Sequence, residues 1–238
     1  MQSTIPDQAL FGFAIPPHPR GPKRTKDSKV AHGSRPEMPK GSVAHVTIKL
    51  KAGLPSLRKG EALAVVRAAI ERVNAGKKIR IVEYSIQSNH VHLIVEAANS
   101  ADLSAGMASL NTGLGMRLNR VWDRVGQGSV FAERFHLVLV SSPPQMRRAL
   151  NYVLRNDVHH RLHLKGLDPC SSAPAFAGWE QLQGIASKAR TAAAAKRCVS
   201  TKPQTWLLRV GWQQVKGAEG LLSTEQWPSI ARVRALEC

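Results

Sequence analysis

Two histidines separated by one residue are the clearest candidates for chemistry in this sequence. His90 and His92 occur in the stretch Y-S-I-Q-S-N-H-V-H-L-I-V at residues 84–95. Read with a period of two, this stretch predicts two strands joined by a turn at Ser88-Asn89, with both imidazoles on one face of the second strand. Their Cα atoms would be about 7 Å apart. Imidazole is a common ligand for divalent metals, so the two rings could bind one ion, although many such pairs are simply solvated.

A tyrosine and an asparagine four residues apart form a second candidate constellation. Pro143 and Pro144 occupy positions where proline is favoured at the start of a helix. Further along this helix, Tyr152 and Asn156 have the spacing of neighbours on one face. We therefore expect Asn156 to offer its amide oxygen to whichever site receives the phenol of Tyr152. The alternative is that Tyr152 is half-buried packing with a hydrated hydroxyl, as most helical tyrosines are.

The apolar pattern predicts the elements that must position these residues. H-V-T-I-K-L at 45–50 alternates as a half-buried strand, and a helix closed by Gly76 follows it. A strand at 79–86 precedes the histidine strand, a helix follows Asn99-Ser100, and a last strand ends with the apolar residues 137–140. This order is that of an α+β, ferredoxin-like (RRM-like) fold, an antiparallel sheet with two helices on one face. The tyrosine helix is an addition to that fold.

The chain divides by composition into three parts. We interpret residues 1–41 as a basic, Pro/Gly-rich disordered arm, 42–160 as the domain that carries both constellations, and 161–238 as a loop-rich and helical C-terminal extension. Tryptophans of the extension could stack on unpaired bases or simply anchor it to the core. These tryptophans are Trp179, Trp206, Trp212 and Trp227.

The charge of the chain indicates a polyanionic partner. Its 238 residues include 34 Lys and Arg against 16 Asp and Glu, a net charge of +18, and nucleic acid is the usual partner of such a protein. We find no apolar run of about 18 residues and no basic amphipathic helix with an aromatic face, so we predict no membrane role. No signal peptide is apparent, and three widely spaced cysteines fit a reducing cytoplasm.

The segment from His45 to about Asn156 resembles the HUH-class single-strand DNA transposases with one catalytic tyrosine, including the REP-associated tyrosine transposases. Three stretches carry the resemblance. Q-S-N-H-V-H-L-I-V at 87–95 is similar to the family's histidine strand, and S-V-F-A-E-R-F-H at 129–136 to the approach to its last strand. A-L-N-Y-V-L-R-N at 149–156 is similar to its tyrosine helix.

The resemblance implies a function and a set of site residues. Tyr152 would be the nucleophile, and His90, His92 and Asn156 would bind Mg²⁺ or Mn²⁺. The substrate would be single-stranded or hairpin DNA, cut and rejoined through a 5′-phosphotyrosine, and both a monomer and a homodimer are open. We expect five arginines either to contact DNA phosphates or to form a solvated face. These arginines are Arg117, Arg120, Arg124, Arg148 and Arg155.

Three alternatives are open at this point. Asn156 is followed by Asp157 where many relatives have proline, so the chain could be a domesticated relative. It could also be a non-catalytic, ferredoxin-like module that binds single-stranded nucleic acid on its sheet. Such modules usually present paired aromatics on the central strands, where this chain offers Tyr84 alone beside the histidines. A two-histidine phosphoesterase would need a second motif, for which H-V-T at 45–47 is the candidate.

Overall fold

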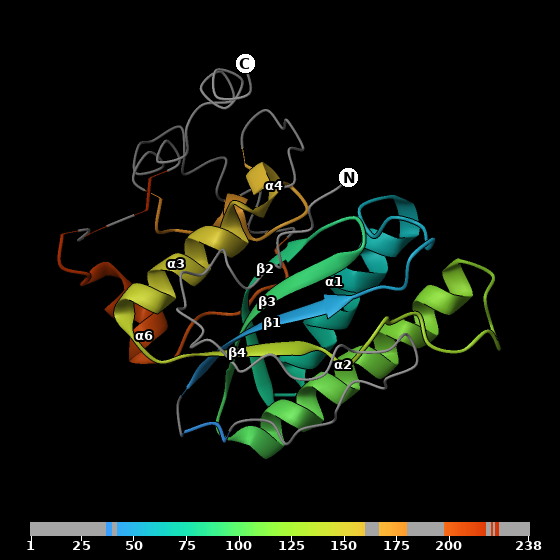
Figure 1. The fold of residues 1–238 in the computed structure, drawn as a ribbon, viewed down its shortest axis with the longest axis horizontal. Coiled ribbons are helices and arrows are strands. Elements are labelled where there is room, and N and C mark those ends of the chain that lie inside the picture. Colours follow the sequence, from blue (N-terminus) through green and yellow to red (C-terminus); the bar gives the residue numbers. More distant parts are fainter. Residues whose placement is uncertain are drawn as a thin grey trace, which may run out of the picture. The chain divides into compact units, whose positions relative to one another are not determined.

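The computed structural model describes residues 37–39, 42–159, 167–179, 198–217, 220 and 222–223. The first six elements are β1 (Val43–Lys49), α1 (Gly60–Ala75), β2 (Ile79–Ile86), β3 (His90–Ala97), α2 (Ser100–Val121) and β4 (His136–Val140). They are followed by α3 (Pro143–Leu154) and the short α4 (Asn156–His159), as Figure 1 shows. The predicted ferredoxin-like order with an added helix is confirmed. None of the described helices combines the length and the apolar character needed to cross a membrane.

The four strands form one antiparallel sheet in the order β2-β3-β1-β4. The hairpin between β2 and β3 has the predicted two-residue turn, because the backbone N–H of Gln87 donates to the carbonyl of His90 at 2.9 Å. β1 lies between β3 and β4, and its Thr47 is directly opposite His92. Side chains alternate between the two faces along each strand, so the two faces differ in composition.

One face of the sheet is apolar and is covered by α1 and α2 (Figure 1). Val46, Tyr84 and Leu93 pack there with the buried stripes of both helices in one core. α2 approaches β2 closely at Gly106, where an added Cβ would lie 2.6 Å from Cγ2 of Ile79. This close packing fixes the position of the sheet relative to its two helices.

α3 packs on the opposite face of the sheet. It begins after Ser142 with two prolines, as predicted, and most of its side chains are buried. They are buried on more than one side because the C-terminal chain also contacts the helix. Arg147 donates to the carbonyl of Gly220 at 2.7 Å, and its guanidinium lies 5.9 Å from the ring centroid of Trp212. The helix is therefore held between the sheet and the chain that follows it.

Part of the C-terminal chain runs along β2, which is an edge strand of the sheet. The N–H of Ile86 donates to the carbonyl of Cys170 at 3.0 Å, and the N–H of Thr201 donates to the carbonyl of Ile81 at 3.0 Å. An uncovered edge strand would expose these backbone groups to pairing with other chains. Short helical turns follow, among them η2 (Ala173–Ala175), α6 (Trp206–Arg209) and η4 (Gly211–Gln213).

The tryptophans of this region have two different environments. Trp179 and Trp212 are 0% and 3% exposed, which confirms the anchoring interpretation for them. Trp206 is 56% exposed, so the anchoring interpretation is wrong for it. Trp227 lies outside the described residues.

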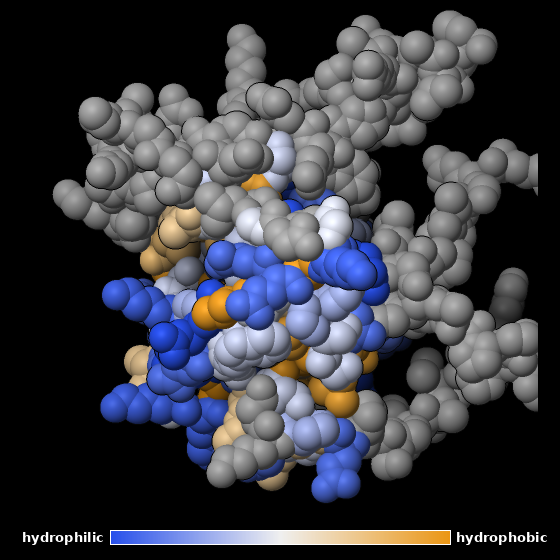
Figure 2. All heavy atoms as spheres, turned by 90° about the vertical axis from the view of Figure 1, so that its left-hand side faces the viewer, coloured by the Kyte–Doolittle hydropathy of each residue, from blue (hydrophilic) through white to orange (hydrophobic). Residues whose placement is uncertain are grey.

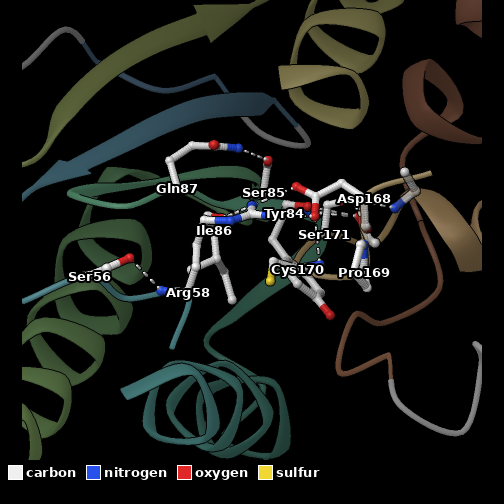
Figure 3. A network of polar contacts seen from close by, with 12 residues as sticks. Ser56, Arg58, Tyr84, Ser85, Ile86, Gln87, Asp168, Pro169, Cys170 and Ser171 are labelled. Atoms are coloured by element: carbon white, nitrogen blue, oxygen red, sulfur yellow. Dashed lines mark hydrogen bonds and ion pairs between the residues drawn. The ribbon is translucent and has the colours of Figure 1, made fainter. Parts of the chain in front are cut away.

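An ion pair between the half-buried Arg58 and the buried Asp168 joins the C-terminal chain to the segment between β1 and α1 (Figure 3). The two guanidinium nitrogens Nη1 and Nη2 of Arg58 each donate to one carboxylate oxygen of Asp168 at 2.8 Å. Arg58 Nη1 also donates to the carbonyl of Ile86 at 2.7 Å, and the N–H of Cys170 donates to Asp168 at 2.9 Å. The Asp168 side chain is 1% exposed, and the carboxylate raises the pKa of Arg58.

We expect Asp168→Ala to lower the free energy of unfolding by about 2 kcal/mol, because it leaves the half-buried guanidinium of Arg58 without its counter-charge and the backbone N–H of Cys170 without its acceptor. Urea unfolding followed by circular dichroism measures this value. The double variant Arg58→Met/Asp168→Leu should lose less than the sum of its single variants, and Glu133→Ala on an exposed loop is the control. A loss below about 1 kcal/mol for Asp168→Ala would mean that the pair does not stabilise the fold.

Candidate functional site

Polar side chains gather between α3 and the sheet. The face of the sheet under α3 carries alternate residues of β1, β2 and β3, since the other residues of these strands belong to the core. His45 is 3% exposed, His92 is 0% exposed and Tyr152 of α3 is 5% exposed. Burying so many polar groups in one layer costs free energy unless they contact one another.

The two predicted histidines lie side by side on β3. Their ring centroids are 4.7 Å apart and the rings are nearly perpendicular, at 85°. His90 is half-buried at the hairpin end of the strand, and its Nδ1 lies 2.8 Å from the side-chain oxygen of Asn89. An amide oxygen accepts hydrogen bonds and cannot donate them, so His90 carries its proton on Nδ1. Its other nitrogen, Nε2, is then the atom that can coordinate a metal.

Two residues of β1 contact His92, and the sequence analysis singled them out only as the H-V-T motif of the phosphoesterase alternative. Nδ1 of His92 lies 3.1 Å from Nε2 of His45 and 3.1 Å from the hydroxyl of Thr47. The rings of His45 and His92 are stacked, with centroids 5.2 Å apart. The signal was the H-V-T alternation itself, because residues two apart on a strand share a face. The predicted ferredoxin-like fold places β1 beside β3, but the sequence did not reveal the register that sets Thr47 opposite His92.

Tyr152 contacts both buried histidines. Its ring centroid is 5.1 Å from that of His92 and 5.8 Å from that of His45, with edge-to-face angles of 83° and 77°. The structure therefore brings the tyrosine and the histidine strand together, as expected if the added helix packs across the sheet. Tyr84 lies on the opposite face, in the apolar core, where burial raises the pKa of its phenol.

The expectation that Asn156 shares a helix with Tyr152 is wrong. α3 ends at Leu154, Arg155 leaves the helical conformation at φ −117°, and Asn156 begins α4. Asn and Asp favour the first positions of a helix over its interior because their side chains compete for nearby backbone groups, which is consistent with a new helix beginning at Asn156-Asp157. Asn156 is nevertheless 0% exposed.

The predicted ligands are chemically of a kind that a divalent metal binds, since imidazole nitrogens and amide oxygens both coordinate such ions. Among the described residues, no group of three or more His, Cys, Asp or Glu side chains is arranged to hold a metal ion. The predicted set is of another kind, two imidazoles and one amide. Both amide atoms of Asn156 are buried and have no hydrogen-bond partner within the described ranges. A buried amide is normally satisfied, so the side chain is suited to an additional ligand.

Glu83 is a buried carboxyl group that the sequence did not indicate. It lies on β2 opposite Ile94, two residues from Ser85, which is paired with His92. It is 8% exposed, and one of its oxygens has no hydrogen-bond partner in the part of the chain described. Burial raises the pKa of Glu83 to about 8. A hydrogen bond with Ser172 has the opposite effect on this pKa and is the smaller of the two. The polar layer thus contains a carboxyl group whose burial favours the protonated form.

The five predicted DNA-binding arginines do not form one group. Arg117, Arg120 and Arg124 lie on and just beyond α2, which covers the apolar face of the sheet, whereas Arg148 lies on α3 and Arg155 at its C-terminal end. Arg120 and Arg148 are exposed and the other three are half-buried. Their contact with DNA stays a prediction.

The fold and the site define an α+β protein of ferredoxin-like type whose added helix encloses a layer of histidines and a tyrosine. Residues 44–156 contain this entire layer and match the family model described as "Transposase IS200 like". Over these residues the chain is similar to the IS200-like transposase family. No curated protein matches the chain.

Two solved structures are similar to the chain at low identity. One is a REP-associated tyrosine transposase bound to a REP hairpin, with 18% identity over 55% of this chain and 74% of that chain, at a TM-score of 0.46. The other is a candidate transposase from Deinococcus radiodurans R1, with 13% identity over 57% of this chain and 95% of that chain, at a TM-score of 0.37.

The raised pKa of Glu83 predicts a pH dependence of stability. From the ordinary value of 4.5 up to about 8, the unfolded chain loses this proton while the folded chain keeps it. The contribution of Glu83 to the free energy of unfolding is therefore complete below pH 4.5, and it is lost as the pH rises through 8. Relative to Glu83→Gln, we expect wild type to lose about 1.4 kcal/mol of unfolding free energy per pH unit between pH 5 and 7.5.

Urea unfolding at a series of pH values measures this difference. Glu71→Gln is the matched control, because Glu71 is exposed on α1. Parallel pH profiles of wild type and Glu83→Gln would contradict the burial of a protonated Glu83.

Proposed function

We propose that this protein cleaves and rejoins single-stranded DNA as a transposase or nickase, with Tyr152 as the nucleophile. The observation that carries the proposal is the contact of the Tyr152 ring with His92, at 5.1 Å between centroids, inside the segment that matches the transposase family. A hydroxyl nucleophile beside groups that can hold a metal is an arrangement that supports phosphoryl transfer.

The proposed reaction is a transesterification that conserves the number of phosphodiester bonds. The phenol oxygen of Tyr152 forms a bond to phosphorus while the bond between phosphorus and the 3′ oxygen breaks. The phenol gives up one proton and the leaving oxygen takes up one, so the products are a 5′-phosphotyrosine and a 3′-hydroxyl. Attack by a 3′-hydroxyl on the phosphotyrosine reverses the step and rejoins the DNA. No ATP is consumed, because the covalent intermediate keeps the bond energy.

We propose that His90, His92 and Asn156 hold Mg²⁺ or Mn²⁺. When bound, the ion would polarise the scissile phosphate and favour charge on the entering oxygen of Tyr152, whose phenol has an ordinary pKa of about 10. Two nitrogen donors and one oxygen donor suit Mn²⁺ better than Mg²⁺. His92 and Asn156 are completely buried, so the chain shields these two proposed ligands from bulk water.

The proposed partner is single-stranded or hairpin DNA. The net charge of +18 supplies attraction to phosphates, and the exposed Lys49 is directly opposite the half-buried His90 at the open end of the layer. Figure 2 shows the side of the molecule on which α6 and the start of α3 lie, where strongly hydrophilic side chains gather around small apolar patches. We propose that Lys49, Arg148 and Arg155 guide a DNA strand toward Tyr152.

A cytoplasmic location is part of the proposal, and Cys170 and Cys198 are free thiols as expected there. The described site takes Tyr152 and both histidines from one chain, so its assembly does not need a second copy. A homodimer stays a prediction.

The packing argues against the alternative of an RRM-style binding module. Such a module stacks bases on an open sheet face. Here one face is occupied by the core and the other by α3, with His45 and His92 at 3% and 0% exposure. A strand laid flat on this sheet would have to displace the helix.

We expect Tyr152→Phe to abolish the covalent protein–DNA adduct that wild type forms with a hairpin oligonucleotide and Mn²⁺. The substitution removes one oxygen and little packing, so folding and DNA binding should be unchanged. A denaturing gel detects the adduct as a slower-migrating band. Tyr84→Phe, on the opposite face of the sheet, is the control and should retain the band. An adduct that persists in Tyr152→Phe contradicts the proposed nucleophile, and a wild type that forms none on any hairpin favours the binding module.

A further inference from the structure

We propose that His45 and Thr47 are positioning residues that hold His92 in the tautomer with its proton on Nδ1, so that Nε2 is presented to the metal. This inference rests on the proposed function and adds two residues to it. Neither residue belongs to the predicted ligand set, and both come from a different strand.

The geometry places both residues on one nitrogen of His92. Thr47 is the direct cross-strand partner of His92, and its hydroxyl lies 3.1 Å from Nδ1. His45, two residues earlier on the same face of β1, brings its Nε2 to 3.1 Å from the same atom. Because His45 and His92 are 3% and 0% exposed, water does not compete for these contacts.

The chemistry of imidazole determines which ring nitrogen of His92 must carry the proton if the other binds a metal. A neutral ring has one protonated nitrogen and one with a lone pair, and only the latter binds a metal. Nδ1 of His92 is occupied by two protein groups, so Nε2 is the coordinating atom and Nδ1 must carry the proton. His45 then accepts this proton through Nε2, together with the Thr47 hydroxyl. Partners of this kind typically contribute 10- to 100-fold to metal affinity or activity.

The same logic already applies to His90, which donates from Nδ1 to the side-chain oxygen of Asn89 at 2.8 Å. Both histidines would therefore be held in one tautomer, His90 by its chain neighbour and His92 by β1. His45 also contacts the Tyr152 ring edge to face, with centroids 5.8 Å apart. It thus orients the proposed ligand while packing against the proposed nucleophile.

Two readouts on the full-length chain test the proposal without relying on activity. The ¹⁵N shifts of His92 in the metal-free protein report its tautomer, and electron paramagnetic resonance of Mn²⁺ reports metal affinity. His45→Phe keeps a ring of similar size and removes the acceptor, whereas His45→Gln restores an acceptor at the distance of Nε2. Thr47→Val and Thr47→Ser form the equivalent pair.

We expect wild-type His92 to be protonated on Nδ1. His45→Phe should weaken Mn²⁺ binding about 10- to 100-fold and shift His92 toward the other tautomer, with most of the affinity regained in His45→Gln. Thr47→Val should act in the same direction even if His45→Phe does not fold. Protonation of wild-type His92 on Nε2, or unchanged Mn²⁺ affinity in both His45→Phe and Thr47→Val, would overturn the proposal.

His92→Ala separates this proposal from the proposed function. If His92→Ala binds Mn²⁺ as wild type does, the metal site itself is wrong. If His92→Ala loses Mn²⁺ while His45→Phe and Thr47→Val retain it, the metal site stands and the positioning role alone fails.

Discussion

The packing of α3 against the polar face of the sheet is the constraint on which the rest of this structure depends. Without the helix, the buried layer of His45, His92 and Glu83 would face solvent, and Tyr152 would have no histidine to contact. With the helix in place, the same polar groups are removed from water and must satisfy one another. The site is therefore a product of tertiary packing, because no single element contains it.

The C-terminal chain provides much of what holds α3 in place. Arg147 on α3 donates to the carbonyl of Gly220, and Trp212 lies against its guanidinium. The same chain is fixed to the sheet at several points, among them Glu96, whose carboxylate accepts from the backbone N–H groups of Gln204 and Thr205 at 3.0 and 2.7 Å. The part of this region that the structure describes thus belongs physically to the domain that carries the site.

The fold and the histidine pair could be predicted because they depend on local patterns. A period of two specifies which residues of a strand share a face, so His90 and His92 were placed together correctly, and the Ser88-Asn89 turn followed from the same alternation. The order of strands and helices then restricted the fold to the ferredoxin-like type.

The remaining parts of the site depend on contacts that alternation does not encode. The predicted fold implies that β1 pairs with β3, but the roles of His45 and Thr47 depend on the register that sets Thr47 opposite His92. Asn156 was misplaced because helical spacing was extended past the point where α3 ends. Trp206 differs from Trp212 in exposure for reasons of tertiary packing alone.

The central claim is that one chain supplies both the nucleophile and the histidines, through α3 packed on its own sheet. Mixing Tyr152→Phe with His92→Ala in the presence of a hairpin oligonucleotide and Mn²⁺ tests it, since each variant lacks one half of the site. A small fraction of wild type added to either variant calibrates the detection of the covalent adduct. The account predicts that the mixture forms no adduct at any ratio. An adduct recovered on mixing would show that Tyr152 acts on the histidines of a second chain, and would contradict the account.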